Sequence, residues 1–109
     1  MTLKKGRKHD MATMELLGKR YVPEIIGHIE NNPGQTYGQI IYAVSDCKGG
    51  ERTIYLRLEE LRQAGIIDSG ERVLDGIIQR TVRLTEYGTY IAGKLHALQE
   101  ALEDREACA

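Results

Sequence analysis

The sequence has no phenylalanine and no tryptophan, and its six tyrosines are the only aromatic residues. A core must therefore be built from isoleucine, leucine and valine, with tyrosine at its margins. No apolar run approaches the roughly 20 residues of a membrane span, and no hydrophobic stretch of a secretory signal follows the basic start, 1–10. These absences predict a cytoplasmic protein that makes no contact with a membrane.

Cysteine and the usual catalytic groupings are also scarce. The two cysteines, Cys47 and Cys108, form no CxxC pair and have no histidine at metal-ligand spacing. The three histidines are scattered, no acidic pair has a cleft-like context, and no glycine-rich phosphate loop occurs. We therefore expect no metal, no cofactor and no enzymatic activity, with the thiols reduced as is usual in a cytoplasm.

The formal net charge of −1 argues, taken alone, against a nucleic-acid-binding protein. The charges are nevertheless unevenly distributed. Residues 1–20 hold six basic and two acidic side chains, a balance of +4, whereas residues 86–109 hold two basic and five acidic ones, a balance of −3. A basic end and an acidic end indicate either separate tasks or simply two solvated termini.

Two helices are predicted before residue 34. The first covers 11–17, with Met14 and Leu17 on one face. The second begins at Pro23, which suits a first helical turn, and ends at the turn-forming segment 31–34. Its apolar face consists of three isoleucines: Ile25, Ile26 and Ile29.

The next two helices carry stronger signals at their ends. Thr36 and Gln39 have capping-box spacing and start a helix that runs to about Val44. After the turn-rich segment 45–50, residues 51–64 form the strongest helical pattern so far, followed by a glycine where a C-cap glycine belongs. Apolar side chains at i, i+4 and i+7 define its buried stripe: Ile54, Leu58 and Leu61.

Two extended runs follow, 66–73 and 77–84, with Leu-Asp-Gly between them, and the Asp-Gly pair is typical of a hairpin turn. In the second run one face carries Ile78, Val82 and Leu84. Thr85 can then cap a long final helix. This order predicts a fold that is mainly α with a small β-hairpin, a winged helix-turn-helix, which presents one helix and one hairpin on the same side for DNA.

Three stretches between about Glu15 and Lys94 resemble the HxlR type of winged-helix regulators, and more loosely the PadR and MarR types. Residues 15–21 are similar to the family's entry into its second helix, 52–67 to its recognition helix and exit, and 84–88 (Leu-Thr-Glu-Tyr-Gly) to its step from wing to final helix. The resemblance implies a transcription regulator that binds double-stranded DNA. It does not imply redox or aldehyde sensing, because the cysteine that oxidant-sensing relatives carry near the domain's start is missing here.

The exposed side of the helix over 51–64 is the expected major-groove surface. Arg52 is the candidate for a bidentate contact to guanine. Leu56 packs either on a thymine methyl group or against a neighbouring helix, and Arg57 either neutralises a phosphate or pairs with Glu60. The two carboxylates Glu59 and Glu60 should face away from DNA. The remaining candidates, for a phosphate or a base edge, are Thr53 and Tyr55.

Three further elements are expected to contact the DNA. The start of the third helix offers backbone N–H groups beside Thr36, Tyr37 and Gln39, although Tyr37 can instead form an edge of the core. The wing, 66–84, supplies three arginines to the backbone or minor groove, Arg72, Arg80 and Arg83, although Asp75 weakens the positive charge at its turn. A flexible basic arm supplies a strongly salt-dependent contribution from Lys4, Lys5, Arg7 and Lys8.

The final helix predicts a homodimer. Apolar side chains spaced by 4, 3 and 4 form a heptad seam: Ile91, Leu95, Leu98 and Leu102. The stripe can alternatively cover the subunit's own core, but a helix of about 20 residues is about 30 Å long, more than a domain this small needs. The expected organisation is a basic arm, 1–10, a winged-helix domain, 11–85, and a dimerisation helix, 86–109, with an inverted-repeat operator.

Two hypotheses compete with direct DNA readout. Winged helices also serve as protein-interaction scaffolds in transcription and other assemblies, and the mild overall acidity favours this alternative whereas the arginines favour DNA. The other competing hypothesis is a ligand-responsive repressor with an unknown small-molecule effector in a dimer cleft between the final helix and the second helix.

Overall fold

The structure, a computed structural model, describes residues 8–45 and 49–107. Helix α1 spans Lys8–Leu17 and α2 spans Val22–Asn31. Helix α1 thus begins three residues before the expected start, and Lys8, expected in the flexible arm, belongs to this helix. The expected arm residues Lys4, Lys5 and Arg7 and the cysteines Cys47 and Cys108 lie outside the described residues.

Local sequence signals account for the ends of α2 and α3. Tyr21 precedes α2 with a φ of 73°, and a proline occupies the first turn. Helix α3 spans Tyr37–Val44 and begins with the predicted capping box. The Gln39 N–H donates to the Thr36 hydroxyl oxygen (3.2 Å), and the Thr36 N–H donates to Gln39 Oε1 (2.9 Å). Two otherwise unpaired donors of the helix start are satisfied in this way.

Helix α4 spans Glu51–Gln63 and supplies the centre of the core. Its predicted stripe is confirmed, because Ile54, Leu58 and Leu61 are fully buried. The chain leaves the helix through Gly65, whose φ of 77° is one that residues with a Cβ rarely adopt. This sharp exit sends the chain directly into the wing.

Three strands form one antiparallel sheet in the order β1-β3-β2: β1 (Gln35–Thr36), β2 (Ile67–Leu74) and β3 (Ile77–Leu84). Asp75 and Gly76 both have positive φ, 53° and 78°, as a type I′ hairpin turn requires. Leu74, expected within the turn, instead pairs with Ile77 at the end of the ladder. The short strand β1 was not expected, and it ties the start of α3 to the wing.

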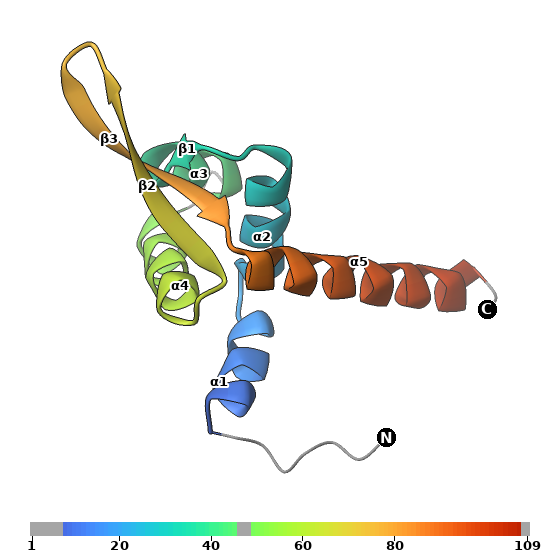
Figure 1. Cartoon of the computed structure of the whole chain (residues 1–109). Coiled ribbons are helices and arrows are strands. Elements are labelled where there is room, and N and C mark those ends of the chain that lie inside the picture. Colours follow the sequence, from blue (N-terminus) through green and yellow to red (C-terminus); the bar gives the residue numbers. More distant parts are fainter. Residues whose placement is uncertain (1–7, 46–48, 108–109) are drawn as a thin grey trace.

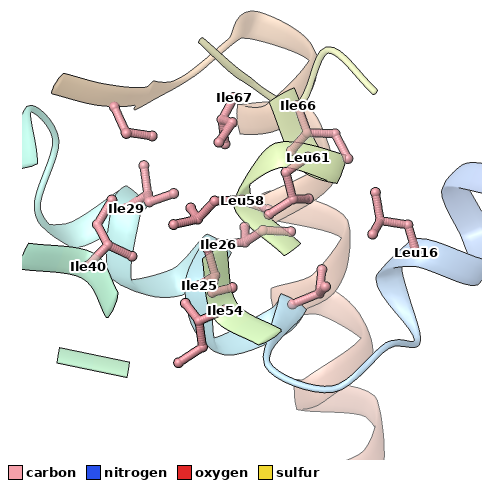
Figure 2. Close-up of a cluster of buried hydrophobic side chains, with 13 residues drawn as sticks. Leu16, Ile25, Ile26, Ile29, Ile40, Ile54, Leu58, Leu61, Ile66 and Ile67 are labelled. Atoms are coloured by element: carbon pink, nitrogen blue, oxygen red, sulfur yellow. The ribbon is translucent and has the colours of Figure 1, made fainter. Parts of the chain in front are cut away.

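The core is a cluster of aliphatic side chains between α2, α4 and the base of the wing (Figure 2). The predicted isoleucine face of α2 is buried in it. The expectation for the first helix is wrong in one respect: Met14 is 69% exposed, whereas Leu16 is buried in the cluster and Leu17 packs partly buried against it. Helix α1 points away from the body, so only its last turn meets the core (Figure 1).

Helix α5 spans Glu86–Ala107 and is anchored at its start by Thr85. The Thr85 N–H donates to the Ile66 carbonyl (3.0 Å), its hydroxyl donates to the Gly65 carbonyl (2.5 Å), and the Gly88 N–H donates to the Thr85 hydroxyl oxygen (2.9 Å). From this joint α5 runs away from the body (Figure 1). Within the described ranges, none of the helices has the length and apolar character needed to cross a membrane.

Candidate nucleic-acid interface

Helix α4 and the wing lie on one side of the molecule, and α5 projects from the other (Figure 1). Arg52 and Leu56, on the side of α4 opposite the core stripe, are exposed, Leu56 by 48%. Leu56 is therefore not enclosed by a neighbouring helix of its own subunit. The two side chains on which the groove-reading hypothesis depends are open to solvent.

Two tyrosines join α3 to α4. The rings of Tyr37 and Tyr55 pack edge to face, with centroids 5.8 Å apart and planes at 73°. Tyr37 is partly buried against the core, which is the alternative role considered for it, while Tyr55 is about half exposed. Thr53, two residues before Tyr55 and therefore on the other flank of α4, is partly buried. The aromatic pair is thus a direct packing contact between α3 and α4.

Arg57 is engaged within the protein. Its guanidinium pairs with the Glu60 carboxylate one helical turn on, and Lys19 Nζ lies 2.7 Å from the same carboxylate. The hydrogen bond from Lys19, with that from Arg57, lowers the pKa of Glu60. Of the two roles considered for Arg57, the structure therefore contains the i,i+3 ion pair with Glu60. A phosphate would have to compete with Glu60 for the Arg57 guanidinium.

The outer side of α3 carries a side chain that the sequence analysis missed. Tyr42 is 87% exposed and lies three residues from the exposed Gln39, so the two share one helical face. Thr36 and Gln39 hold each other in the capping box. The helical period that places Ile40 inside also places Tyr42 outside, and this signal was available in the sequence.

Strand pairing divides the three wing arginines between the two faces of the hairpin. Arg80 pairs with Glu71 and shares the face of the buried Val82. Arg72 and Arg83 lie on the other face. Arg72 Nε donates to Gln79 Oε1 (3.2 Å), and Arg83 Nη2 lies 3.8 Å from Asp68 Oδ2. All three guanidinium groups belong to exposed residues.

The tip of the wing is apolar. Ile78, expected on the same face as Val82, is exposed because the hairpin extends beyond the body that covers Val82 (Figure 1). Its cross-strand partner Val73 is exposed as well, and so are Leu74 and Ile77, the last pair of the ladder, which lie on the opposite face of the hairpin. The strand pattern alone did not predict that all four aliphatic side chains at the tip would be exposed.

A polar cavity of about 350 Å³ separates α4 from the wing. We call it the wing hollow, and it is lined by Tyr37, Arg62, Ser69, Glu71 and Arg80. At its α4 side Arg62 Nη2 donates to Glu59 Oε2 (2.8 Å). Arg62 was not a candidate in the sequence, because the helical period alone does not show that the wing folds back beside the last turn of α4.

The heptad stripe of α5 has two different environments. Ile91 and Leu95 pack partly buried against the core of their own subunit. Leu98 and Leu102, farther along the helix, are 57% and 54% exposed. Between these halves His96 Nε2 lies 2.5 Å from Glu30 Oε1 on α2, and the hydrogen bond and charge of Glu30 raise the pKa of His96.

Two of the sequence expectations concern a metal site and a cavity between α2 and α5. Among the described residues, no group of three histidine, cysteine, aspartate or glutamate side chains is placed to hold a metal ion. A cavity of about 60 Å³ lies between α2 and α5, which is space for only about two waters. A larger cavity, of about 530 Å³, opens between α1 and α4 beside Leu16 and Gln63.

No protein-family profile matches the chain, and no curated protein sequence matches it. Several solved structures, however, do match it. The diamide-treated form of YodB from B. subtilis is 21% identical, with a TM-score of 0.71 over 93% of this chain and 96% of that one. A protein from Thermoplasma volcanium, described as a possible HxlR family transcriptional factor, is 19% identical, with a TM-score of 0.69 over 98% and 89%.

A third match is a mutant of MepR from S. aureus bound to an oligodeoxyribonucleotide. It is 16% identical, with a TM-score of 0.67 over 93% of this chain and 72% of that one. The chain has the winged helix-turn-helix fold of these regulators. At the level of fold, the resemblance to the HxlR and MarR types that the sequence motifs indicated is confirmed.

Proposed function

We propose that this protein is a non-enzymatic transcription regulator that binds double-stranded DNA as a homodimer, with α4 in the major groove and the wing on the backbone or in the minor groove. The observation that carries the proposal is the open side of α4, where Arg52 and Leu56 are exposed on the side of the molecule that also bears the wing. The DNA-bound MepR mutant, which shares this fold, adds support.

Each element has a defined task in this proposal. Arg52 sits in the first turn of α4, the part of a recognition helix that reaches base edges, and its guanidinium can donate two hydrogen bonds to guanine. Leu56, one turn on, packs on a thymine methyl group. Gln39 and Tyr42 on α3 and the wing arginines contact the backbone, which fixes the register of α4.

The outer half of α5 supports the proposed dimer. Two large leucines exposed one turn apart, Leu98 and Leu102, continue the stripe that Ile91 and Leu95 begin against the core. A second copy of the helix related by a two-fold axis buries them. Two α4 helices then meet two half-sites about one DNA turn apart, which requires an inverted-repeat operator.

A mobility shift with a random-sequence duplex tests the proposal. Retardation should weaken steeply between about 50 and 200 mM salt, because bound phosphates release counterions. Arg52→Gln should weaken binding of the dimer to a preferred sequence by about a hundredfold, because about tenfold is lost with the bidentate contact in each of the two half-sites. Lys94→Gln removes the same charge from exposed α5 and should leave binding almost unchanged.

The apolar wing tip favours one other function, a protein-interaction scaffold. Four exposed aliphatic side chains on a projecting hairpin, with Asp75 at its turn, suit a protein surface better than a phosphate backbone. A scaffold shows no salt-sensitive retardation of duplex DNA. The same mobility shift therefore separates the two functions.

A further inference from the structure

Charged and polar groups from four elements meet at the wing hollow. Tyr37 comes from the start of α3, Arg62 from the last turn of α4, and Arg80 from the inner face of β3. Ser69 and Glu71 come from β2. A group entering the hollow would meet two guanidinium groups, a phenol hydroxyl, a serine hydroxyl and one carboxylate.

A carboxylate already interacts with these same groups. Arg62 donates a 2.8 Å hydrogen bond to Glu59, and both side chains interact with the Tyr37 hydroxyl. The hydrogen bond from Arg62, together with Tyr37 and the positive charge of Arg80, lowers the pKa of Glu59. Burial, and then the charge of Glu59, raise the pKa of Tyr37, which keeps its hydroxyl protonated as a donor.

The groups that donate to Glu59, a guanidinium and a phenol hydroxyl, are also suitable hydrogen-bond donors to a phosphate. Arginine binds carboxylate and phosphate through the same planar fork, and a tyrosine hydroxyl donates to either. Each arginine of the hollow has a carboxylate near it. Arg62 pairs with Glu59, and Arg80 lies opposite Glu71 on the neighbouring strand. The hollow is therefore charge-balanced while no external anion is bound.

We infer that the wing hollow is a binding site for one phosphate of the DNA backbone, and that Glu59 competes with this phosphate for Arg62 and Tyr37. The inference rests on the proposed function and adds to it a phosphate site with an internal competitor. On binding, the phosphate takes the guanidinium of Arg62, and Glu59 turns to solvent. A phosphate held here would lie between α4 and the wing and would fix their register on the duplex.

Neutralising Glu59 should tighten binding. A like charge about 4 Å from a phosphate in water-like surroundings corresponds to about a fivefold change in affinity per subunit, so the Glu59→Gln dimer should bind duplex DNA roughly 25-fold more tightly. Arg62→Gln should bind more weakly and lower the slope of log affinity against log salt by about one unit per subunit. Glu24→Gln, the same charge change on the exposed start of α2, is the control and should have little effect.

The double variant Glu59→Gln/Arg62→Gln separates competition from general repulsion. If Glu59 acts by occupying Arg62, its removal gains nothing once Arg62 is gone. If Glu59→Gln tightens binding equally in the presence and absence of Arg62, or if Glu24→Gln tightens binding as much, the inference is wrong. Circular dichroism and urea unfolding of each variant check that the fold is retained.

Titration with inorganic phosphate tests the site without DNA. The NMR signals of the Arg62 and Arg80 side-chain N–H groups should shift with phosphate in the Glu59→Gln protein, at about fivefold lower concentration than in the wild type, and Arg62→Gln should abolish the shift. DNA binding without this response overturns the inference alone. A phosphate response without DNA binding overturns the proposed function and leaves the anion site, and absence of both overturns both.

Discussion

Replacing Gly88 by alanine perturbs the joint between the wing and α5. A Cβ on Gly88 would lie 3.0 Å from the carbonyl carbon of Ile66 and closer still to its oxygen, nearer than real Cβ atoms approach backbone. That oxygen accepts the Thr85 N–H at 3.0 Å. The carbonyl therefore cannot move aside without loosening the cap of α5.

The expected cost combines three contributions. Forcing a methyl group into a packed site costs about 1–3 kcal/mol, and losing the Thr85 hydrogen bond costs about 1 kcal/mol. Alanine returns about 1 kcal/mol through its higher helix propensity. The free energy of unfolding should fall by about 1–3 kcal/mol, which lowers the urea midpoint by about 1–2 M if the m-value is about 1.5 kcal/mol/M.

Gly93 provides the matched control on the same helix. A Cβ there has no atom within 4 Å, so Gly93→Ala should stabilise the protein by about 0.5–1 kcal/mol. Urea unfolding followed by circular dichroism, at one protein concentration for all variants, measures both. If Gly88→Ala proves as stable as Gly93→Ala, the described packing of Gly88 against Ile66 is wrong.

Three further predictions concern the cap of α3, the α2–α5 ion pair and the dimer. Thr36→Ala removes the capping box and should lower the free energy of unfolding by about 0.5–2 kcal/mol in urea, whereas Thr36→Ser should retain most of it. Because Glu30 raises the pKa of folded His96, this pair stabilises the protein fully below about pH 6.5, and its contribution is lost as pH rises through the raised value. The stability difference between wild type and His96→Gln should therefore shrink from about pH 5.5 to 8.5, and a constant difference would contradict the pairing. Leu98→Glu with Leu102→Glu should give monomers in sedimentation at concentrations where the wild type is dimeric, with unchanged circular dichroism per residue.

Elements with a strong local period or a complete end signal could be predicted from the sequence. The stripe of α4, the isoleucine face of α2 and the capping box at Thr36 are present as expected. Each depends on residues within one or two helical turns, or on the first residues of a helix. Asp75 and Gly76 likewise adopt positive φ because the hairpin turn needs it locally.

The features that the sequence did not predict depend on how helices and strands pack against one another. Met14 and Leu16 are equally plausible inward residues on a short helix, and only the direction of α1 relative to the core selects Leu16. Strand β1 has two residues, too few for a period, and forms because the wing lies beside it. Ile78 alternates correctly with Val82, but the sequence does not show where the body ends and the projecting hairpin begins.

The candidate site shows the same division. The exposure of Arg52 and Leu56 follows from the helical period of α4. The pairing of Arg57 with Glu60, and the approach of Arg62 to the wing, depend on rotamers and on contacts between elements. Arginine positions could thus be listed from sequence, whereas which arginines already have a carboxylate partner could not.

The proposed function depends on base-edge readout in the major groove by the open side of α4. Selecting bound sequences from a random duplex pool, with the wild type and with Arg52→Ala, measures this readout. The wild type should enrich an inverted repeat, and Arg52→Ala should lose base preference at one symmetry-related pair of positions. If no sequence is enriched, or if both proteins enrich an identical repeat, α4 does not read base edges through Arg52.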